Sequence, residues 1–284
     1  RAYAKYLWQA GFTFSQDHVE DTLTANPQIS AMLIALFKFR FDPEKYIEDT
    51  TESQQLVQKE RIEKALDNVS NLNEDRILRR YMDVILATVR TNYYQIDMRN
   101  PKSGSSKPYF SFKLQSKKIP ELPLPIPLYE IFVYSPRVEA IHLRVAKVAR
   151  GGIRWSDRRE DFRTEILGLM KTQQVKNSVI VPMGAKGGFF VKKMPAEGTR
   201  EQMTIEVIYC YETLIRGLLD LTDNYKGNEI FNPPNTICFD DYDPYLVVAA
   251  DKGTATFSDI ANTISKEYGF WLGDAFASGG ITGY

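Results

Sequence analysis

A single lysine stands among three glycines in the segment VPMGAKGGFF, residues 181–190. Glycine lets the backbone approach another group closely, and Lys186 can then present its amine to that group. The apolar run SVIVP, residues 178–182, predicts a buried strand just before it, so we expect Lys186 in a loop at a strand end, where α/β proteins bind ligands. Burial lowers the pKa of a lysine and suits its amine to acid–base chemistry near neutral pH. A solvated loop lysine is the alternative interpretation.

The same segment does not match the standard phosphate-binding motifs. A P-loop needs a serine or threonine after its lysine and then a helix, whereas Gly187, Gly188 and the strand-like FFV follow Lys186. The GxGxxG fingerprint of dinucleotide-binding domains does not occur anywhere in the 284 residues. The sequence therefore favours a lysine that acts on a substrate over one that holds a phosphate.

A second candidate group lies in ARGGIRWSDR, residues 149–158, where Arg150 and Arg154 flank the pair Gly151–Gly152. We expect the two glycines to form a turn. Guanidinium groups bind carboxylates through two parallel hydrogen bonds, and glycines allow a substrate to come close. This segment therefore predicts a site for a carboxylate.

Two further charged residues are expected near strand ends. Lys176 ends a predicted helix over residues 157–176, and Asp251 follows YLVVAA, residues 245–250, which predicts a buried strand. Lys176 could instead stabilise the helix C-terminus, and Asp251 could be a turn residue before Gly253. Taken with the segments above, they predict cations for a dicarboxylate or an α-amino acid, beside a lysine and an aspartate that exchange protons.

The chain divides into three stretches that would position these residues. Residues 1–96 carry apolar residues at helical spacing and predict an all-helical segment. Residues 97–127 contain NPKSGSSKP and PELPLPIP and predict a proline-rich connector. Residues 128–284 alternate strand and helix patterns, which predicts an α/β domain with a mixed sheet and flanking helices.

Composition excludes several classes of partner. Lys and Arg together number 36, as do Asp and Glu, so there is no basic excess of the kind that nucleic acid or an anionic membrane surface requires. The only cysteines are Cys210 and Cys238, and there are two histidines, so we expect no metal site. No apolar stretch is long enough for a membrane span, and a reducing, cytoplasmic setting fits the cysteine usage.

The order of the motifs resembles that of glutamate dehydrogenases. RGGIRWSDRREDF, a helix that ends in a lysine, VPMGAKGG and VVAADKGT occur in the same order. The sequences of these motifs are most similar to those of the large, NAD-specific bacterial class. The resemblance is strong over residues 128–284, where it implies the substrate-binding domain of amino-acid dehydrogenases. Residues 1–94 resemble the helical segment that precedes the catalytic region in those enzymes.

The resemblance implies oxidative deamination of L-glutamate to 2-oxoglutarate and ammonium, with hydride transfer to NAD. Lys186 matches the catalytic lysine of the family, and Asp251 matches the aspartate that moves protons to and from the substrate nitrogen. Lys176 matches the residue that binds the α-carboxylate, and Arg150 stands where small family members have a lysine for the side-chain carboxylate. The substrate-binding set that the resemblance implies is Arg150, Gly151, Gly152, Arg154 and Lys176. A cytoplasmic homo-oligomer is also expected.

Two alternatives remain open at this point. The chain could belong to a dehydrogenase for leucine, phenylalanine or valine, which shares the lysine and aspartate chemistry, or it could be a non-catalytic assembly fragment. In the family, the dinucleotide-binding domain follows the segment that ends here at Tyr284. We therefore expect a chain that lacks this domain and does not oxidise glutamate alone.

Overall fold

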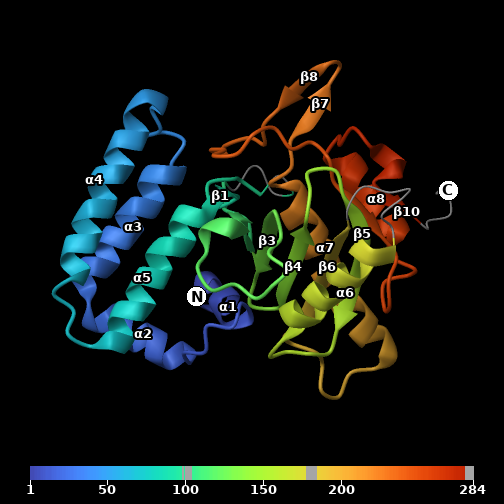
Figure 1. Ribbon diagram of the computed structural model, residues 1–284. Coiled ribbons are helices and arrows are strands. Elements are labelled where there is room, and N and C mark those ends of the chain that lie inside the picture. The colour runs from blue at the N-terminus through green and yellow to red at the C-terminus, as the bar shows by residue number, and fades with distance from the viewer. Residues whose placement is uncertain (98, 100–103, 177–183, 279–284) are drawn as a thin grey trace.

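In the computed structural model, one central sheet separates two groups of helices (Figure 1). The structure describes residues 1–97, 99, 104–176 and 184–278, without the side chains of residues 48–52 and 173–176. Among the described residues, no helix combines the length and the apolar character that a membrane span requires.

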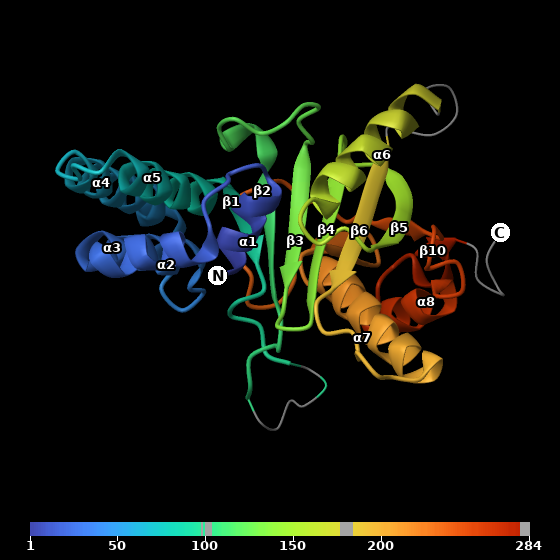
Figure 2. The ribbon, with the colours of Figure 1, turned by 90° about the horizontal axis from the view of Figure 1, so that it is seen from below.

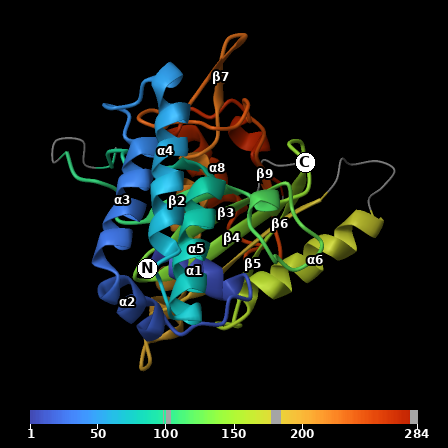
Figure 3. The same cartoon turned by 60° about the vertical axis from the view of Figure 1, so that its left-hand side comes forward.

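Five helices form the N-terminal part of the chain, and Figure 3 shows α3, α4 and α5 side by side. Ser15 caps α2 by accepting a hydrogen bond from the His18 amide at 3.2 Å, and Pro27 stands at the first position of α3. The helical prediction is confirmed as far as Ala87. The five helices are α1 (Ala2–Gln9), α2 (Gln16–Ala25), α3 (Pro27–Phe41), α4 (Glu48–Leu66) and α5 (Leu72–Ala87).

The sheet has eight strands in the order β1-β2-β3-β4-β6-β5-β9-β10. Neighbours from β1 to β6 are antiparallel, whereas β5 is parallel to both β6 and β9, and β9 is parallel to β10. The predicted mixed sheet is therefore confirmed. The strands are β1 (Thr88–Thr91), β2 (Phe110–Gln115), β3 (Tyr129–Tyr134), β4 (Val138–Arg144), β5 (Arg150–Ser156), β6 (Ala185–Val191), β9 (Val247–Ala249) and β10 (Ala277–Ser278).

Helices cover both faces of the sheet (Figure 2). The core on one face combines α1, α5 and α6 (Phe162–Lys176), and the core on the other combines α7 (Arg200–Leu219) and α8 (Ser258–Glu267). A separate hairpin of β7 (Asn224–Lys226) and β8 (Glu229–Phe231) leads from α7 towards β9. The short 3₁₀ helices η2 (Ser116–Lys118) and η3 (Gly273–Ala275) complete the fold.

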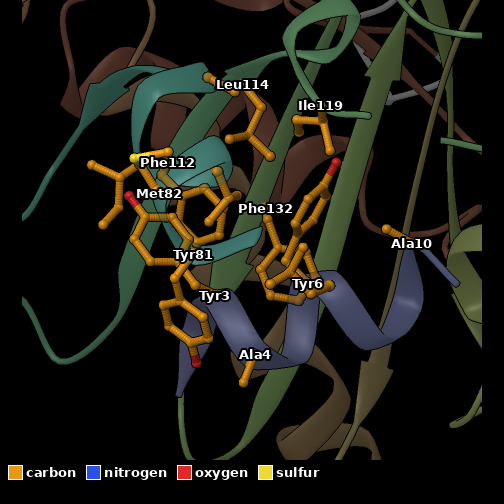
Figure 4. Close-up of a cluster of buried hydrophobic side chains, with 14 of the residues drawn as sticks. Tyr3, Ala4, Tyr6, Ala10, Tyr81, Met82, Phe112, Leu114, Ile119 and Phe132 are labelled. Carbon is orange, nitrogen blue, oxygen red and sulfur yellow. The ribbon is translucent and has the colours of Figure 1, made fainter. Parts of the chain in front are cut away.

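Aromatic side chains join the N-terminal helix α1 to the sheet (Figure 4). The ring centroids of Tyr3 and Phe112 lie 4.6 Å apart, and those of Tyr6 and Phe132 lie 5.7 Å apart. Such pairs stabilise a fold by about 1 kcal/mol each beyond the area that they bury. The N-terminal helices thus share a core with the strands.

The predicted division into residues 1–96, 97–127 and 128–284 stays a prediction. The sheet includes β1 from the first of these stretches and β2 from the second, so all three stretches contribute to it. The structure thus shows one sheet built across both predicted boundaries.

Two local predictions about the glycine-rich segments are wrong. Gly151–Gly152 lies inside β5 and not in a turn, and Lys186 lies inside β6 and not in a loop. The physical reason is strand pairing, because β4 and β5 pair with both edges of β6 and hold its glycines in an extended ladder. The strand predicted over residues 178–182 lies outside the described residues.

Candidate active site

Strand β5 lies between the two strands that carry the candidate catalytic residues. Its Ile153 pairs with Gly187 of β6, so Gly152 lies beside Lys186. On its other edge Gly152 pairs with Ala249, the last residue of β9. Side chains at neighbouring positions of paired strands lie on the same face of a sheet. Strand β6, which carries Lys186, and strand β9, which leads to Asp251, therefore lie on the two sides of Gly152.

Lys186 and Asp251 meet at this point. Lys186 Nζ forms an ion pair with Asp251 Oδ2, and only 5% of Lys186 is exposed. A Cβ atom at Gly152 would lie 3.0 Å from Asp251 Cβ and 3.1 Å from Asp251 Oδ2. The missing side chain at Gly152 therefore leaves the space in which the two groups make contact.

The turn after β9 holds Asp251 in place. Its backbone amide donates to Thr254 Oγ1 at 3.2 Å, and its Oδ1 accepts from the Lys252 amide at 2.6 Å. Thr254 Oγ1 in turn donates to the Ile153 carbonyl on β5. Gly253 has φ +83°, a conformation that glycine adopts without strain. Thr254 was not predicted, although DKGT is a sequence typical of a turn.

The surroundings of Lys186 change its basicity. Burial and the nearby Arg154 guanidinium lower the pKa of Lys186 to about 8, and the Glu165 carboxylate opposes them. A lysine with this pKa is partly neutral at mildly alkaline pH, whereas a solvated lysine is almost fully protonated there. Lys186 can therefore accept and return a proton near neutral pH.

Arg154 lies on β5, on the face that α6 covers. Its Nε atom is 2.8 Å from Glu165 Oε1, and Ser156 Oγ donates to Glu165 Oε2 at 2.6 Å. The guanidinium predicted to bind substrate is therefore engaged with a carboxylate of α6. No sequence motif pointed to Glu165 or Ser156, because their contact joins a strand to a helix.

The other predicted residues occupy different positions. Arg150 is exposed at the start of β5, and strand alternation puts it on the same face as Gly152. Gly151 permits a close backbone approach, since a Cβ atom there would lie 1.5 Å from the Ala185 carbonyl oxygen. Lys176 is the last residue of α6, and its side chain lies outside the described ones.

The glycines of the site do not form a dinucleotide cradle. Gly151, Gly152, Gly187 and Gly188 all lie within strands, whereas such a cradle needs a glycine-rich turn that opens a helix. In the part of the chain that the structure describes, no group of three or more His, Cys, Asp or Glu residues could hold a metal ion.

Two family models and three curated relatives match this chain. Residues 61–284 match the family model described as "Bacterial NAD-glutamate dehydrogenase, catalytic domain", and residues 1–43 match "Glutamate dehydrogenase, helical motif 3". The chain is 59% identical over 286 residues to the NAD-specific glutamate dehydrogenase of Pseudomonas aeruginosa, and 58% identical over 285 residues to that of Halomonas elongata. It is 50% identical over 291 residues to the enzyme of the same name from Mycobacterium tuberculosis. Each alignment covers 100% of this chain but only 17% or 18% of the relative.

Proposed function

The chain belongs to the bacterial NAD-specific glutamate dehydrogenase family, and from this we propose that the full-length protein oxidises L-glutamate to 2-oxoglutarate and ammonium, with NAD as the hydride acceptor. The present chain spans about a sixth of the length of its curated relatives. In the proposal it supplies the residues that bind the substrate and move its protons.

The contact between Lys186 and Asp251 is the observation that carries the proposal. Release of ammonium requires water to add to the iminium carbon of the oxidised substrate. Before hydride transfer, Asp251 takes a proton from the substrate ammonium. Lys186 then takes a proton from this water, Asp251 returns its proton to the nitrogen as the carbon–nitrogen bond breaks, and the hydroxyl proton of the adduct leaves with the ammonia as ammonium. Because the two side chains touch, the proton gained by Lys186 can then pass through Asp251 to solvent, which restores the neutral amine and the carboxylate.

The two carboxylates of glutamate require two cationic partners. We assign the side-chain carboxylate to Arg150, whose exposed guanidinium stands on the same sheet face as Gly152. We assign the α-carboxylate to Lys176 at the end of α6. Gly151 and Gly152 complete the proposed substrate-binding set, since neither adds a side chain beside Lys186. Arg154 contributes positive charge to the same face.

The proposal also covers the domain arrangement and the assembly of the full-length protein. Residues 128–284 form the substrate-binding catalytic unit, preceded by the helical segment and the connector, and the enzyme works as a cytoplasmic homo-oligomer. The dinucleotide-binding residues lie outside the described part of this chain, because its strand-bound glycines do not form the required cradle. We therefore expect that residues 1–284 alone do not reduce NAD in the presence of glutamate.

The direct test is Lys186→Ala in the full-length protein. We expect kcat for glutamate to fall by at least ~100-fold, the scale for acid–base groups, while the thermal unfolding midpoint stays near that of the wild type. Lys193→Ala is the matched control, because Lys193 is an exposed lysine just beyond the same strand. Turnover of glutamate and leucine should be compared in parallel. A Lys186→Ala enzyme with near-normal kcat, or a wild type that prefers leucine, would refute the proposal.

A further inference from the structure

Glu165 is the one anion that α6 presents to the charged face of β5 among the described residues. Its two carboxylate oxygens have separate partners, Arg154 Nε at 2.8 Å and Ser156 Oγ at 2.6 Å. Both side chains of the Arg154–Glu165 pair are largely buried, with 23% and 13% exposed. A charge pair in such a setting is screened less by water than a surface pair.

Helix α6 is fixed where it carries Glu165. The next residue, Ile166, packs directly on Gly188 of β6, where an added Cβ atom would come within 2.3 Å of it. Two residues before Glu165, the Arg163 amide donates to Gln9 Oε1 of α1 at 3.1 Å. The Arg163 side chain forms a fully buried ion pair with Glu130 of β3 at 2.6 Å. Glu165 is therefore held between two anchored residues.

Besides the exposed Arg150 at the start of β5, three charged side chains face Lys186 from the described elements around it. Asp251 approaches from the turn after β9, Arg154 from β5 and Glu165 from α6. From β4, the residue opposite Lys186 is Leu143, which carries no charge. Arg154 disfavours the ammonium form of Lys186, and Glu165 favours it. Arg154 and Glu165 thus act on one titration in opposite directions while binding each other.

We propose that Glu165 is a positioning residue that holds the Arg154 guanidinium on the Lys186 face of β5 and offsets its charge, so that the pair sets the pH at which Lys186 releases its proton. Arg154 then acts through Lys186 rather than by clamping a substrate carboxylate. The catalytic consequence rests on the proposed function. The effect on the protonation of Lys186 does not, and it can be measured without turnover.

Removal of the Glu165 charge and removal of the Arg154 charge should shift the titration of Lys186 in opposite directions. Glu165→Gln removes an anion and leaves the arginine charge unopposed, so Lys186 should lose its proton at lower pH. Arg154→Gln removes the cation, so Lys186 should lose its proton at higher pH. Each shift should be of the order of 1 pH unit, the usual effect of one nearby charge. A loss of packing alone has no reason to move the titration in opposite directions.

Competitive labelling with a trace of acetic anhydride across a pH series measures this titration in the full-length protein. Mass spectrometry of the peptide that contains Lys186 gives its midpoint, expected near pH 8 in the wild type. Exposed Lys193 in the same digest is the internal standard for the labelling of a solvent-exposed lysine. The pH profile of kcat/KM for glutamate should shift in the same direction in each variant.

Two controls keep the outcome decisive. Ser156→Ala removes a hydrogen bond to Glu165 but no charge, so it should move the midpoint less than either charge variant. The double variant Arg154→Gln/Glu165→Gln should fall between the two single variants, and it also serves if Glu165→Gln alone fails to fold. Midpoints that all shift the same way, or that do not move, would overturn the proposal. Opposite shifts in a protein without glutamate turnover would overturn only the proposed function.

Discussion

Lys186 and Asp251 form an ion pair across strand β5, above a glycine that has no side chain to separate them. The two residues come from strands that do not neighbour each other, β6 and the end of β9, with β5 between them. A contact across a whole strand requires the middle strand to be bare at that position. Gly152 meets this requirement and thereby defines the geometry of the pair.

The first prediction concerns Gly152→Ala. The new methyl carbon would lie 3.0 Å from Asp251 Cβ and would push the carboxylate away from Lys186. We expect kcat for glutamate to fall, though by less than the roughly 100-fold that a misplacement of about 1 Å costs, because these contacts require only a small shift, and we expect a small change in stability. The control is Gly168→Ala in α6, where nothing lies within 4 Å of the added carbon. There we expect unchanged kcat and a fold up to about 1 kcal/mol more stable. Equal kcat losses in both variants would contradict the role of Gly152.

The second prediction concerns Asp251→Asn, which keeps the shape of the side chain and removes its charge. We expect kcat to fall about 100-fold, because an amide cannot transfer the proton. Since the carboxylate favours the ammonium form of its partner, Lys186 should also release its proton at lower pH in this variant. Asp241→Asn, which removes an exposed carboxylate paired with Lys147, is the control. An Asp251→Asn enzyme with wild-type rates and pH profile would make Asp251 a simple turn residue.

The third prediction concerns the pH dependence of deamination by the wild type. Burial lowers the pKa of Lys186 to about 8, so the amine is mostly protonated below that pH and mostly neutral above it. Only the neutral amine can accept a proton from water, so kcat/KM should rise with pH through a midpoint near 8. The transition should disappear in Lys186→Ala. A midpoint near the ordinary lysine value of about 10.4 would show that burial does not tune this residue.

Part of this site could be predicted from the sequence alone. Asp251 follows the short apolar strand β9, so its place after a strand end could be predicted from the local pattern, whereas Lys186 lies inside β6 and not in the expected loop. The position of Gly151 and Gly187 within strands could not be predicted in this way. Glycines favour turns in isolation, and it is pairing with β4, β6 and β9 that extends them here.

The long-range contacts of the site had no local signal at all. Gln9 caps α6 by accepting from the Arg163 amide, although 154 residues separate them. Strand β2 lies in the stretch that was predicted to be a proline-rich connector, although its residues FSFKLQ alternate apolar and polar side chains as a strand does. Tertiary partners therefore decide these features, and a single sequence does not show which partners meet.

The last prediction concerns a buried ionic network that supports β9. Asp243, just before β9, accepts from Lys113 Nζ at 2.6 Å and from Arg144 Nη1 at 3.0 Å, and Arg144 Nη1 also donates to the Tyr245 carbonyl at 2.9 Å. Burial alone would raise the pKa of Asp243, but Arg144 and Lys113 hold that pKa well below its ordinary value. The carboxylate therefore stabilises the fold above the unfolded-state pKa of about 3.9, and this stabilisation fades as the pH falls below it.

Asp243→Asn should make this dependence measurable. At pH 7 we expect the free energy of unfolding to fall by about 3–5 kcal/mol, because Lys113 and Arg144 lose a buried counter-charge. The difference from the wild type should shrink as the pH falls from about 5 towards 3, because acid protonates Asp243 in the unfolded wild type before it protonates the folded carboxylate. Glu20→Gln, which breaks the exposed pair with Arg1, should leave the free energy of unfolding at pH 7 close to that of the wild type. Denaturant unfolding at several pH values measures all three proteins, and a constant difference between Asp243→Asn and wild type would show that Asp243 is not charged in the folded state.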